Sequence, residues 1–193
     1  MKNILVLEGA GSSGKTTLAR AILEANPGSL YFHAAPFVGW VVEAHRAMLD
    51  AAKWHAREGK LVVIDRHWIS EYVYGPIFRN AVACSDLDAL ELDRIIRKEG
   101  AYVLCVPSDA TEHERRFQRE RLEKKDLFPT MVAVAERYRR LATGYMHEES
   151  DDYLGRYIKH GDFTMKDCLV YDIDMDGRDV PKFIAKIEKE LGS

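Results

Sequence analysis

A short glycine-rich stretch near the start of the chain carries the clearest chemical signal. Gly9-Ala10-Gly11-Ser12-Ser13-Gly14-Lys15-Thr16 matches the pattern G-x-x-x-x-G-K-[ST], with an apolar run before it and a helical pattern after it. Glycines in such a loop let backbone N–H groups converge on phosphate oxygens, and the start of the following helix adds positive potential. The stretch predicts a nucleotide-binding loop, whose candidate residues are Gly9, Gly11, Ser12, Ser13, Gly14, Lys15, Thr16 and Thr17.

Two side chains of this loop have distinct predicted roles. Lys15 would reach the β and γ phosphates of a bound nucleotide, and the Thr16 hydroxyl would bind Mg²⁺. Because this combination of lysine and threonine follows an apolar run, a chance glycine-rich turn is a poor alternative. The loop indicates nucleotide binding but says nothing about a phosphate acceptor.

A second pair of polar side chains follows another apolar run. Leu61–Ile64 is continuously apolar, as a strand covered on both faces should be, and Asp65 and Arg66 come directly after it. The carboxyl ends of strands in an open parallel sheet line the crevice that holds ligand. We expect Asp65 to hold the Mg²⁺ hydration shell or to accept a proton, and Arg66 to offer a forked cation to a phosphate. Asp172 and Asp174 also follow an apolar run, but a terminal strand usually lies further from the transferring phosphate.

A predicted helix further along carries both signs of charge. Its arginines are Arg115, Arg116, Arg119 and Arg121. Arg115 and Arg119 are one turn apart and share a face of the helix, whereas Arg121 lies off that face unless the helix ends there. Its glutamates would make a solvated helix the ordinary interpretation. Phosphoryl transfer, however, needs cationic charge at the equatorial oxygens of the phosphate, and Ala10–Ser13 contains no arginine. We therefore predict that Arg115, Arg119 and Arg121 act from a lid at about 109–128 that closes over ATP.

The elements that must position these residues alternate along the chain, as in βαβ units with a parallel sheet. The predicted strands are Ile4–Leu7, Ser29–Phe32, Leu61–Ile64, Tyr102–Val106 and Cys168–Ile173. The predicted helices are Thr16–Glu24, Trp40–Arg57, a helix from Ser85 or Asp86 to Lys98, Thr111–Lys124, Met131–Tyr145 and Val180–Leu191. We expect an α/β fold, a three-layer sandwich of the P-loop NTPase type with a five-stranded parallel sheet and a helical lid. One domain would cover residues 1–193, with a surface excursion at 147–166.

Composition and charge bound the cellular setting. A net charge of -3 does not favour a protein built to hold long duplex nucleic acid. Cys84, Cys105 and Cys168 have no metal-ligand spacing and indicate free thiols in a reducing compartment. The apolar run before Glu8 is too short for a signal peptide or a membrane span, so we expect a cytoplasmic protein that does not associate with membranes. Formation of a homodimer is an alternative that the sequence leaves open.

These pieces together resemble the thymidylate kinase and deoxynucleoside kinase group of P-loop enzymes. The stretches similar to thymidylate kinases are Ala44-His45-Arg46-Ala47, Gly59, Val62–Arg66, Ser70, Tyr72–Gly75 and Glu136-Arg137-Tyr138 to Leu141-Ala142. The run Arg115-x-x-x-Arg119-x-Arg121-x-Glu123 looks more like the lid of deoxynucleoside kinases, and Ala35–Trp40 is similar to their Glu-Pro-Val-x-x-Trp segment. The likeness covers about Met1–Ala142 and the final strand and helix. It implies ATP as phosphoryl donor, Mg²⁺, and a nucleotide or nucleoside acceptor.

The resemblance also implies an acceptor site. Arg46 and Arg66 are its candidates for binding the acceptor phosphate, and Trp40 or Phe37 would stack on the base. Tyr74 would select the sugar or close the pocket. The alternatives are a solvated helix face for Arg46, and core packing for Trp40 and Tyr74.

Two departures from the resemblance bear on the acceptor. Ala35 stands where nucleoside kinases carry the glutamate that serves as base, and Gly11 where thymidylate kinases usually carry an acid. A monophosphate is already anionic and needs no strong base, whereas a hydroxyl acceptor would need Asp65 or Glu8 in that role. We therefore expect a thymidylate-kinase-like nucleoside monophosphate kinase. The alternatives are a kinase for a deoxynucleoside or for a hydroxymethylated pyrimidine in DNA, and a nucleotide-binding regulator; the guanine-reading motif Asn-Lys-x-Asp is absent from the sequence.

Overall fold

A computed structural model describes residues 2–34, 39–120, 128–143 and 168–192. Its five strands form one sheet in the order β2-β3-β1-β4-β5, and every neighbouring pair is parallel. The strands are β1 (Ile4–Gly9), β2 (Leu30–His33), β3 (Val62–Asp65), β4 (Gly100–Cys105) and β5 (Leu169–Tyr171). The predictions made for Ala35, Phe37, Arg121 and the excursion at 147–166 lie outside the described residues.

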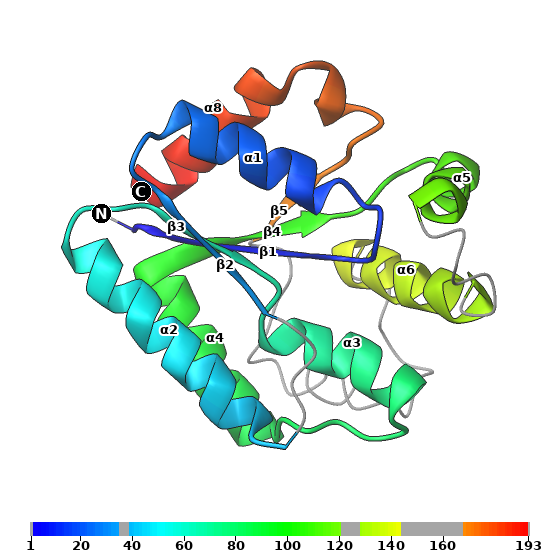
Figure 1. Cartoon of the computed structure of the whole chain (residues 1–193), viewed down its shortest axis with the longest axis horizontal. Coiled ribbons are helices and arrows are strands. Elements are labelled where there is room, and N and C mark those ends of the chain that lie inside the picture. Colours follow the sequence, from blue (N-terminus) through cyan, green and yellow to red (C-terminus); the bar gives the residue numbers. More distant parts are fainter. Residues whose placement is uncertain (1, 35–38, 121–127, 144–167, 193) are drawn as a thin grey trace.

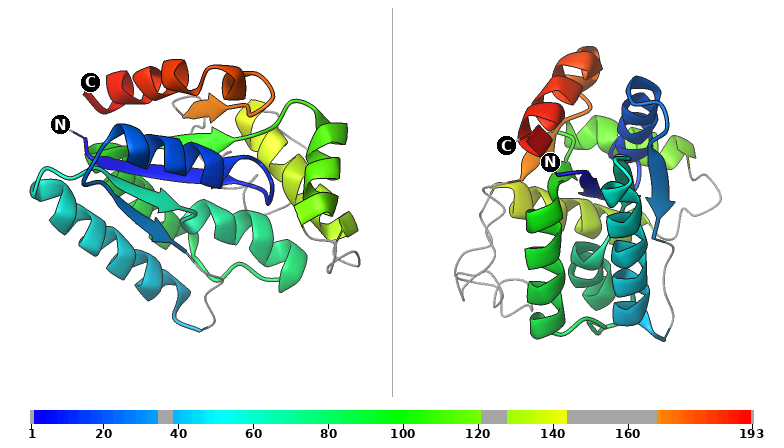
Figure 2. Two further views of the ribbon diagram at one scale, coloured as in Figure 1. Left: turned by 45° about the horizontal axis from the view of Figure 1, so that its top comes forward. Right: turned by 90° about the vertical axis from the view of Figure 1, so that its left-hand side faces the viewer.

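Helices cover both faces of this sheet (Figure 1). The helices are α1 (Lys15–Ala25), α2 (Val41–Arg57), α3 (Trp68–Phe78), α4 (Asp86–Glu99), α5 (Ala110–Glu120), α6 (Phe128–Thr143) and α8 (Val180–Gly192). One face packs on α1 and α8, and the other on α2, α3, α4 and α6, so β1, β3 and β4 are buried along their whole length. Figure 2 shows the three layers from two further directions. The predicted three-layer α/β sandwich is confirmed.

The carboxyl ends of the central strands meet at one edge, where the predicted chemistry lies. In the register of the sheet, Leu7 of β1 pairs with Asp65 of β3, and Gly9 pairs with Cys105 of β4. Parallel strands bring these ends together because each strand runs in the same direction. In Figure 1, α5 and α6 lie beyond this edge.

Within the described residues, the predicted strands and α-helices agree with the structure to within a few residues, but α3 has no predicted counterpart. The helix α3 was not predicted, because the run Trp68–Val73 is buried all round and shows no polar stripe, and Pro76 lies inside the helix. Of the two predicted starts of α4, Ser85 is the capping residue, since its side chain accepts a hydrogen bond from the Asp88 backbone N–H. In the part of the chain that the structure describes, no helix has the length and apolarity needed to cross a membrane.

Candidate phosphoryl-transfer site

The glycine-rich loop lies between β1 and α1, and its backbone explains two of its glycines. Gly9 has a φ of 154°, and a Cβ there would lie 2.5 Å from the Cys105 carbonyl oxygen. Gly14 has a φ of 89°, and a Cβ would lie 2.8 Å from Ile173 Cδ1. Larger residues at either position would clash as well as strain the backbone. Ser12 is also left-handed, with a φ of 58°, so the tip of the loop holds a conformation that costs about 1–3 kcal/mol.

Lys15 is folded back onto its own loop. Its ammonium group donates to the carbonyl oxygens of Gly9 at 2.9 Å and Ala10 at 2.6 Å, and lies 3.5 Å from Ser13 Oγ. The side chain is buried, and burial, together with the charge of Arg66, lowers its pKa to about 8. The loop thus surrounds the desolvated ammonium group with neutral hydrogen-bond acceptors. An anionic phosphate would attract this group more strongly than these acceptors do.

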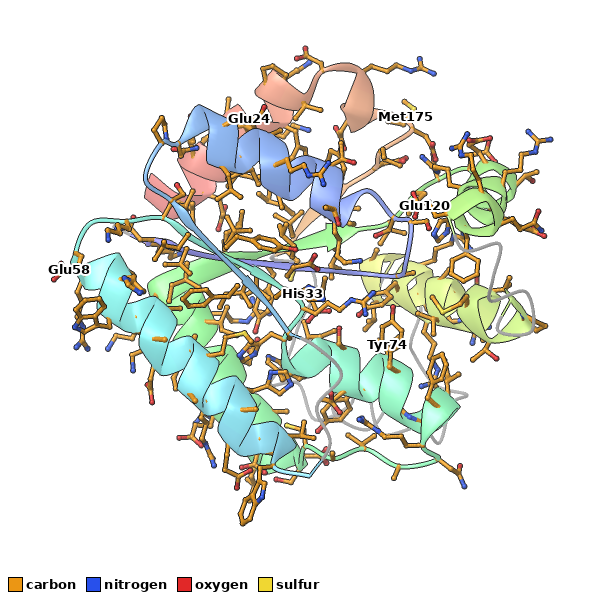
Figure 3. The ribbon with its side chains drawn as sticks, viewed as in Figure 1. Glu24, His33, Glu58, Tyr74, Glu120 and Met175 are labelled. Atoms are coloured by element: carbon orange, nitrogen blue, oxygen red, sulfur yellow. The ribbon has the colours of Figure 1, made fainter. Side chains whose placement is uncertain are left out.

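Asp65, at the end of β3, is on the sheet face that carries α1. Its Oδ2 accepts a hydrogen bond from the Tyr31 hydroxyl at 2.7 Å, and His33 Nδ1 lies 3.6 Å away. Figure 3 shows His33 at the end of β2. Among the described residues, the buried Asp65 Oδ1 has no hydrogen-bond partner. A buried carboxylate oxygen without a partner is costly, and a hydrated divalent cation would satisfy it.

Two side chains at this edge of the sheet carry oxygen donors of the kind that suits magnesium. The Thr16 side chain is exposed at the start of α1, and α1 contacts β3. A carboxylate oxygen and a hydroxyl are hard oxygen ligands of the kind that Mg²⁺ takes alongside phosphates and water. No cluster of three or more metal-binding side chains occurs among the described residues, so the nucleotide and water would complete the coordination.

Arg66 lies on the opposite side of the strand end. Its guanidinium carbon is 4.7 Å from the centre of the Tyr74 ring, and Nε is buried with no partner among the described residues. Burial lowers the pKa of this guanidinium, but the neighbouring Tyr74, Tyr138, Asp65 and Glu8 raise it overall, so the charge is retained. Asp65 thus contacts Tyr31 of β2, whereas Arg66 lies over Tyr74 of α3, so the two side chains face different surroundings.

Glu8 forms a closed network beneath Arg66. Its Oε1 accepts from the His67 backbone N–H at 2.7 Å, and its Oε2 accepts from the hydroxyls of Ser70 and Tyr138, both at 2.8 Å. Burial raises the pKa of Glu8 to about 7, against the lowering effect of these donors. The two hydroxyl oxygens also lie 3.0 Å apart. Protonated Glu8 would supply the third hydrogen needed for all three oxygen–oxygen contacts.

This network bears on the role suggested for Glu8 in the sequence. A general base must reach the proton that it removes. Glu8 is completely buried, and both of its oxygens are already engaged by protein donors. The geometry therefore disfavours Glu8 as the base for a hydroxyl acceptor.

The helix α5 lies directly against the tip of the phosphate loop. The His113 ring is hydrogen-bonded through Nε2 to the Gly11 carbonyl oxygen at 2.8 Å, and the Ser12 hydroxyl donates to Glu120 Oε2 at 2.5 Å. A Cβ on Gly11 would lie 3.2 Å from Met131 Cε and 3.6 Å from the Phe117 ring. Residues of α5 and α6 thus take up the space that an acid at position 11 would need, and a cavity of about 70 Å³ remains beside the contact.

The predicted lid arginines point elsewhere. Arg115 is exposed and lies 3.7 Å from Glu112 of its own helix, and Arg119 is also exposed. Arg116 instead turns inward, with Nη2 2.9 Å from Asp174 Oδ1. The sequence correctly placed Arg115 and Arg119 on one face of α5, but this face is opposite to the one that meets the loop. Asp174 also accepts a hydrogen bond from the Asp109 backbone N–H, so it links the segment before α5 to the segment after β5.

The remaining acceptor candidates are placed as follows. Arg46 Nη2 is 2.9 Å from Asp88 Oδ1 and 2.5 Å from Glu91 Oε2, so an acceptor phosphate would compete with two carboxylates for it. Trp40 is 79% exposed just before α2, which excludes core packing. Tyr74, which Figure 3 shows on α3, is half-buried. Its ring stacks on Phe78 and meets the Tyr138 ring edge to face.

For some residues of the site, no pattern in the sequence predicts the contacts that they make in the structure. They are Tyr31, His113, Arg116 and Tyr138. Each contacts a partner far away in the chain, as Tyr138 does with Glu8 across 130 positions. Glu8 belongs to the otherwise apolar strand β1 in the structure, and a buried carboxyl group of this kind requires hydrogen-bond partners.

Comparisons with known proteins bear on the fold. No protein-family model and no curated protein sequence matches the chain. The YorR protein from Bacillus subtilis, solved in complex with phosphorylated GDP, matches with a TM-score of 0.67 and 15% identity over 98% of each chain. This likeness is one of fold.

Deoxyadenosine kinase from M. mycoides matches in two solved states, both at 12% identity. The structure with the products dCMP and dCDP has a TM-score of 0.50 and covers 98% of each chain. The structure with bound dATP has a TM-score of 0.51 and covers 98% of this chain and 100% of the other. The resemblance to deoxynucleoside kinases that the sequence suggested is confirmed for the fold.

Proposed function

We propose that this protein is an ATP-dependent kinase that phosphorylates a nucleoside monophosphate. The observation that carries the proposal is the pairing of two cations at the same edge of the sheet. Lys15 lies in the phosphate loop, and Arg66 lies at the end of the neighbouring strand, close enough for its charge to lower the pKa of Lys15. One cation suits the donor phosphates, and the other suits an anionic acceptor.

The donor side would be built by the loop and by the start of α1. Lys15 would exchange its contacts with the Gly9 and Ala10 carbonyls for the β and γ phosphate oxygens of ATP. Thr16 and Asp65 would hold Mg²⁺ with the nucleotide. When bound, the ion neutralises charge on the phosphates and on the leaving group.

On the acceptor side, Arg66 would bind the phosphate of the monophosphate. Its guanidinium lies over Tyr74, and its Nε has no hydrogen-bond partner among the described residues. An oxygen of that phosphate would attack the γ phosphorus of ATP, and the bond between this phosphorus and the β–γ bridging oxygen would break. ADP leaves with the bond's electron pair, and no proton has to be removed because the attacking oxygen is already anionic. Arg119 is exposed on α5. It would reach the transferring phosphate only if α5 rotated so that its exposed face met the phosphate loop.

Two observations support an acceptor that carries phosphate. Glu8 is closed off by three donors, so the crevice lacks it as a base for a hydroxyl. The YorR protein, with the same fold, was solved with a phosphorylated nucleotide. Since Arg46 is engaged by Asp88 and Glu91, the proposal rests on Arg66 alone for the acceptor phosphate.

A nucleoside acceptor is the second candidate, because deoxyadenosine kinase shares the fold. A screen of nucleosides, monophosphates and oligonucleotides with labelled ATP separates the two. We expect a pyrimidine deoxynucleoside monophosphate to be phosphorylated far better than its parent nucleoside, and Arg66→Ala to raise its KM. Comparable rates on both would move the assignment to the nucleoside, and activity only on a hydroxymethylated oligonucleotide would move it to DNA. Nucleotide binding with no transfer to any of them would indicate a regulator.

A further inference from the structure

The backbone at Arg66 has an unusual shape that Glu8 stabilises directly. Arg66 has a φ of 72°, in the left-handed region that side chains rarely adopt. The peptide that follows it carries the His67 N–H, which donates to Glu8 Oε1 at 2.7 Å. A left-handed residue persists only where its surroundings fix it. The fully buried Glu8 carboxylate is such a fixed partner, because it belongs to the central strand of the sheet.

The same carboxylate also supports the aromatic surface on which the Arg66 side chain lies. Glu8 Oε2 accepts from the Tyr138 hydroxyl at 2.8 Å, and the Tyr138 ring faces the Tyr74 ring with centroids 6.4 Å apart. The Arg66 guanidinium carbon then lies 4.7 Å from the centre of the Tyr74 ring. Glu8 thus reaches Arg66 by two routes, one through the backbone and one through the two tyrosines.

We propose that Glu8 is a positioning residue, which holds the backbone and guanidinium of Arg66 in the orientation that receives the acceptor. This role rests on the proposed function only in giving Arg66 an anionic acceptor to bind. It differs from general-base catalysis, since Glu8 touches neither substrate. It also differs from ordinary core stabilisation, because its effect should pass through Arg66.

Two substitutions at Glu8 separate positioning from burial. Glu8→Gln keeps a carbonyl oxygen for the His67 N–H, and its amide can donate to the two hydroxyl oxygens. Glu8→Met fills a similar volume but accepts no hydrogen bond. We expect Glu8→Met to raise the acceptor KM about tenfold with the ATP KM unchanged, and Glu8→Gln to stay close to the wild type.

A matched control removes another buried carboxylate. Asp93 of α4 is 1% exposed and accepts from Arg97 Nε at 2.9 Å, far along the chain from the crevice residues. Asp93→Leu should lower the melting temperature but leave both KM values unchanged. In an Arg66→Ala background, Glu8→Met should add nothing to the acceptor KM. An equal further increase there, or the same KM change in Asp93→Leu, would overturn the proposal.

A structural readout keeps the test independent of the enzyme activity. In a crystal structure of Glu8→Met, we expect Arg66 to leave the left-handed region and its guanidinium to leave the Tyr74 ring. An unchanged Arg66 would refute the positioning role, even if no acceptor is ever found. If Glu8→Met does not fold, Tyr138→Phe removes one of the two routes; it should raise the acceptor KM less, and again not in the Arg66→Ala background. If the wild type phosphorylates no nucleotide while Arg66 moves as expected, the proposed function alone fails.

Discussion

The Glu120 carboxylate of α5 lies 2.5 Å from the Ser12 hydroxyl at the tip of the phosphate loop. Figure 3 shows Glu120 at the end of α5, beside that loop. An anionic group at this place opposes the entry of the anionic phosphates of ATP. We predict that Glu120→Ala binds ATP a few-fold more tightly than the wild type, as expected for an exposed charge.

Calorimetric titration with a non-hydrolysable ATP analogue measures this change. Glu120→Gln keeps a hydrogen-bond acceptor for Ser12 and removes only the charge, so it isolates the electrostatic part. Glu112→Gln is the matched control, since it makes the same charge change on the same helix, beside Arg115. Tighter binding in all three variants would show a general effect of net charge. Unchanged binding in Glu120→Ala would show that the contact between Glu120 and Ser12 does not affect ATP affinity.

Lys15 should take up a proton when ATP binds. Burial lowers its pKa to about 8, so near that pH a sizeable share of the side chains is neutral without nucleotide. Contact with anionic phosphates favours the ammonium form and raises the pKa again. We predict proton uptake at pH 8, measured from binding enthalpies in buffers of different ionisation enthalpy.

A Lys15→Ala variant tests the assignment of that proton. It should lose the uptake and lower the transfer rate by at least about a hundredfold while it still folds. Lys53→Ala, which removes a surface lysine paired with Asp50, should change neither. Near-normal turnover in a folded Lys15→Ala protein would contradict the role given to the phosphate loop.

Glu8 should make stability depend on pH in an identifiable window. Its pKa rises from 4.5 to about 7 in the folded protein because of burial. The folded state therefore binds more protons than the unfolded state across this window, and the stabilisation present below pH 4.5 is lost as pH rises through 7. The loss corresponds to about 3 kcal/mol as an order of magnitude.

The Glu8→Gln variant isolates this effect. Other groups also titrate, such as His67, whose burial lowers its pKa to about 3, but they are shared by both proteins. The free energy of unfolding of the wild type minus that of Glu8→Gln should fall between pH 5 and pH 8, as measured by urea denaturation. A difference that stays flat, or that rises with pH, would show that Glu8 is not protonated in the folded protein.

The sequence predicted the parts of this molecule that depend on local pattern. The phosphate loop needs only its own residue types and its place between a strand and a helix, and the strand ending at Asp65 is marked by its unbroken apolar run. The helix α3 lacks such a pattern, because its buried residues surround it on every side. Its helical state depends on packing between the sheet and α6.

The site was harder to predict because it depends on distant contacts. Helical spacing correctly grouped Arg115 with Arg119, but spacing cannot tell which face of a helix meets the loop. His113 and Phe117 hold that face, since Gly11 leaves room for them. The position of Arg46 depends likewise on the carboxylates of α4, which no local pattern connects to it.

Asp65 and Tyr31 give the last prediction, which concerns magnesium. The Tyr31 hydroxyl donates to Asp65 Oδ2, and the buried Oδ1, which has no partner among the described residues, is the oxygen that we propose for the ion. Without the hydroxyl, the carboxylate can rotate, and the magnesium concentration needed for half-maximal activity should rise several-fold. Tyr31→Phe should therefore change the magnesium requirement, while ATP binding measured without magnesium stays the same. Asp65→Asn should cut kcat heavily with little change in ATP affinity.

The matched control for this prediction is Tyr171→Phe. The Tyr171 hydroxyl is buried and has no hydrogen-bond partner among the described residues, so its removal should leave the magnesium requirement unchanged. Magnesium binding in the presence of the ATP analogue, followed by calorimetry, gives a readout that does not depend on turnover. An equal effect of the two tyrosine substitutions would assign the change to general loosening of the sheet. A normal requirement in Tyr31→Phe would mean that Asp65 is oriented by the strand alone, because the hydroxyl would then add nothing to the geometry that β3 imposes.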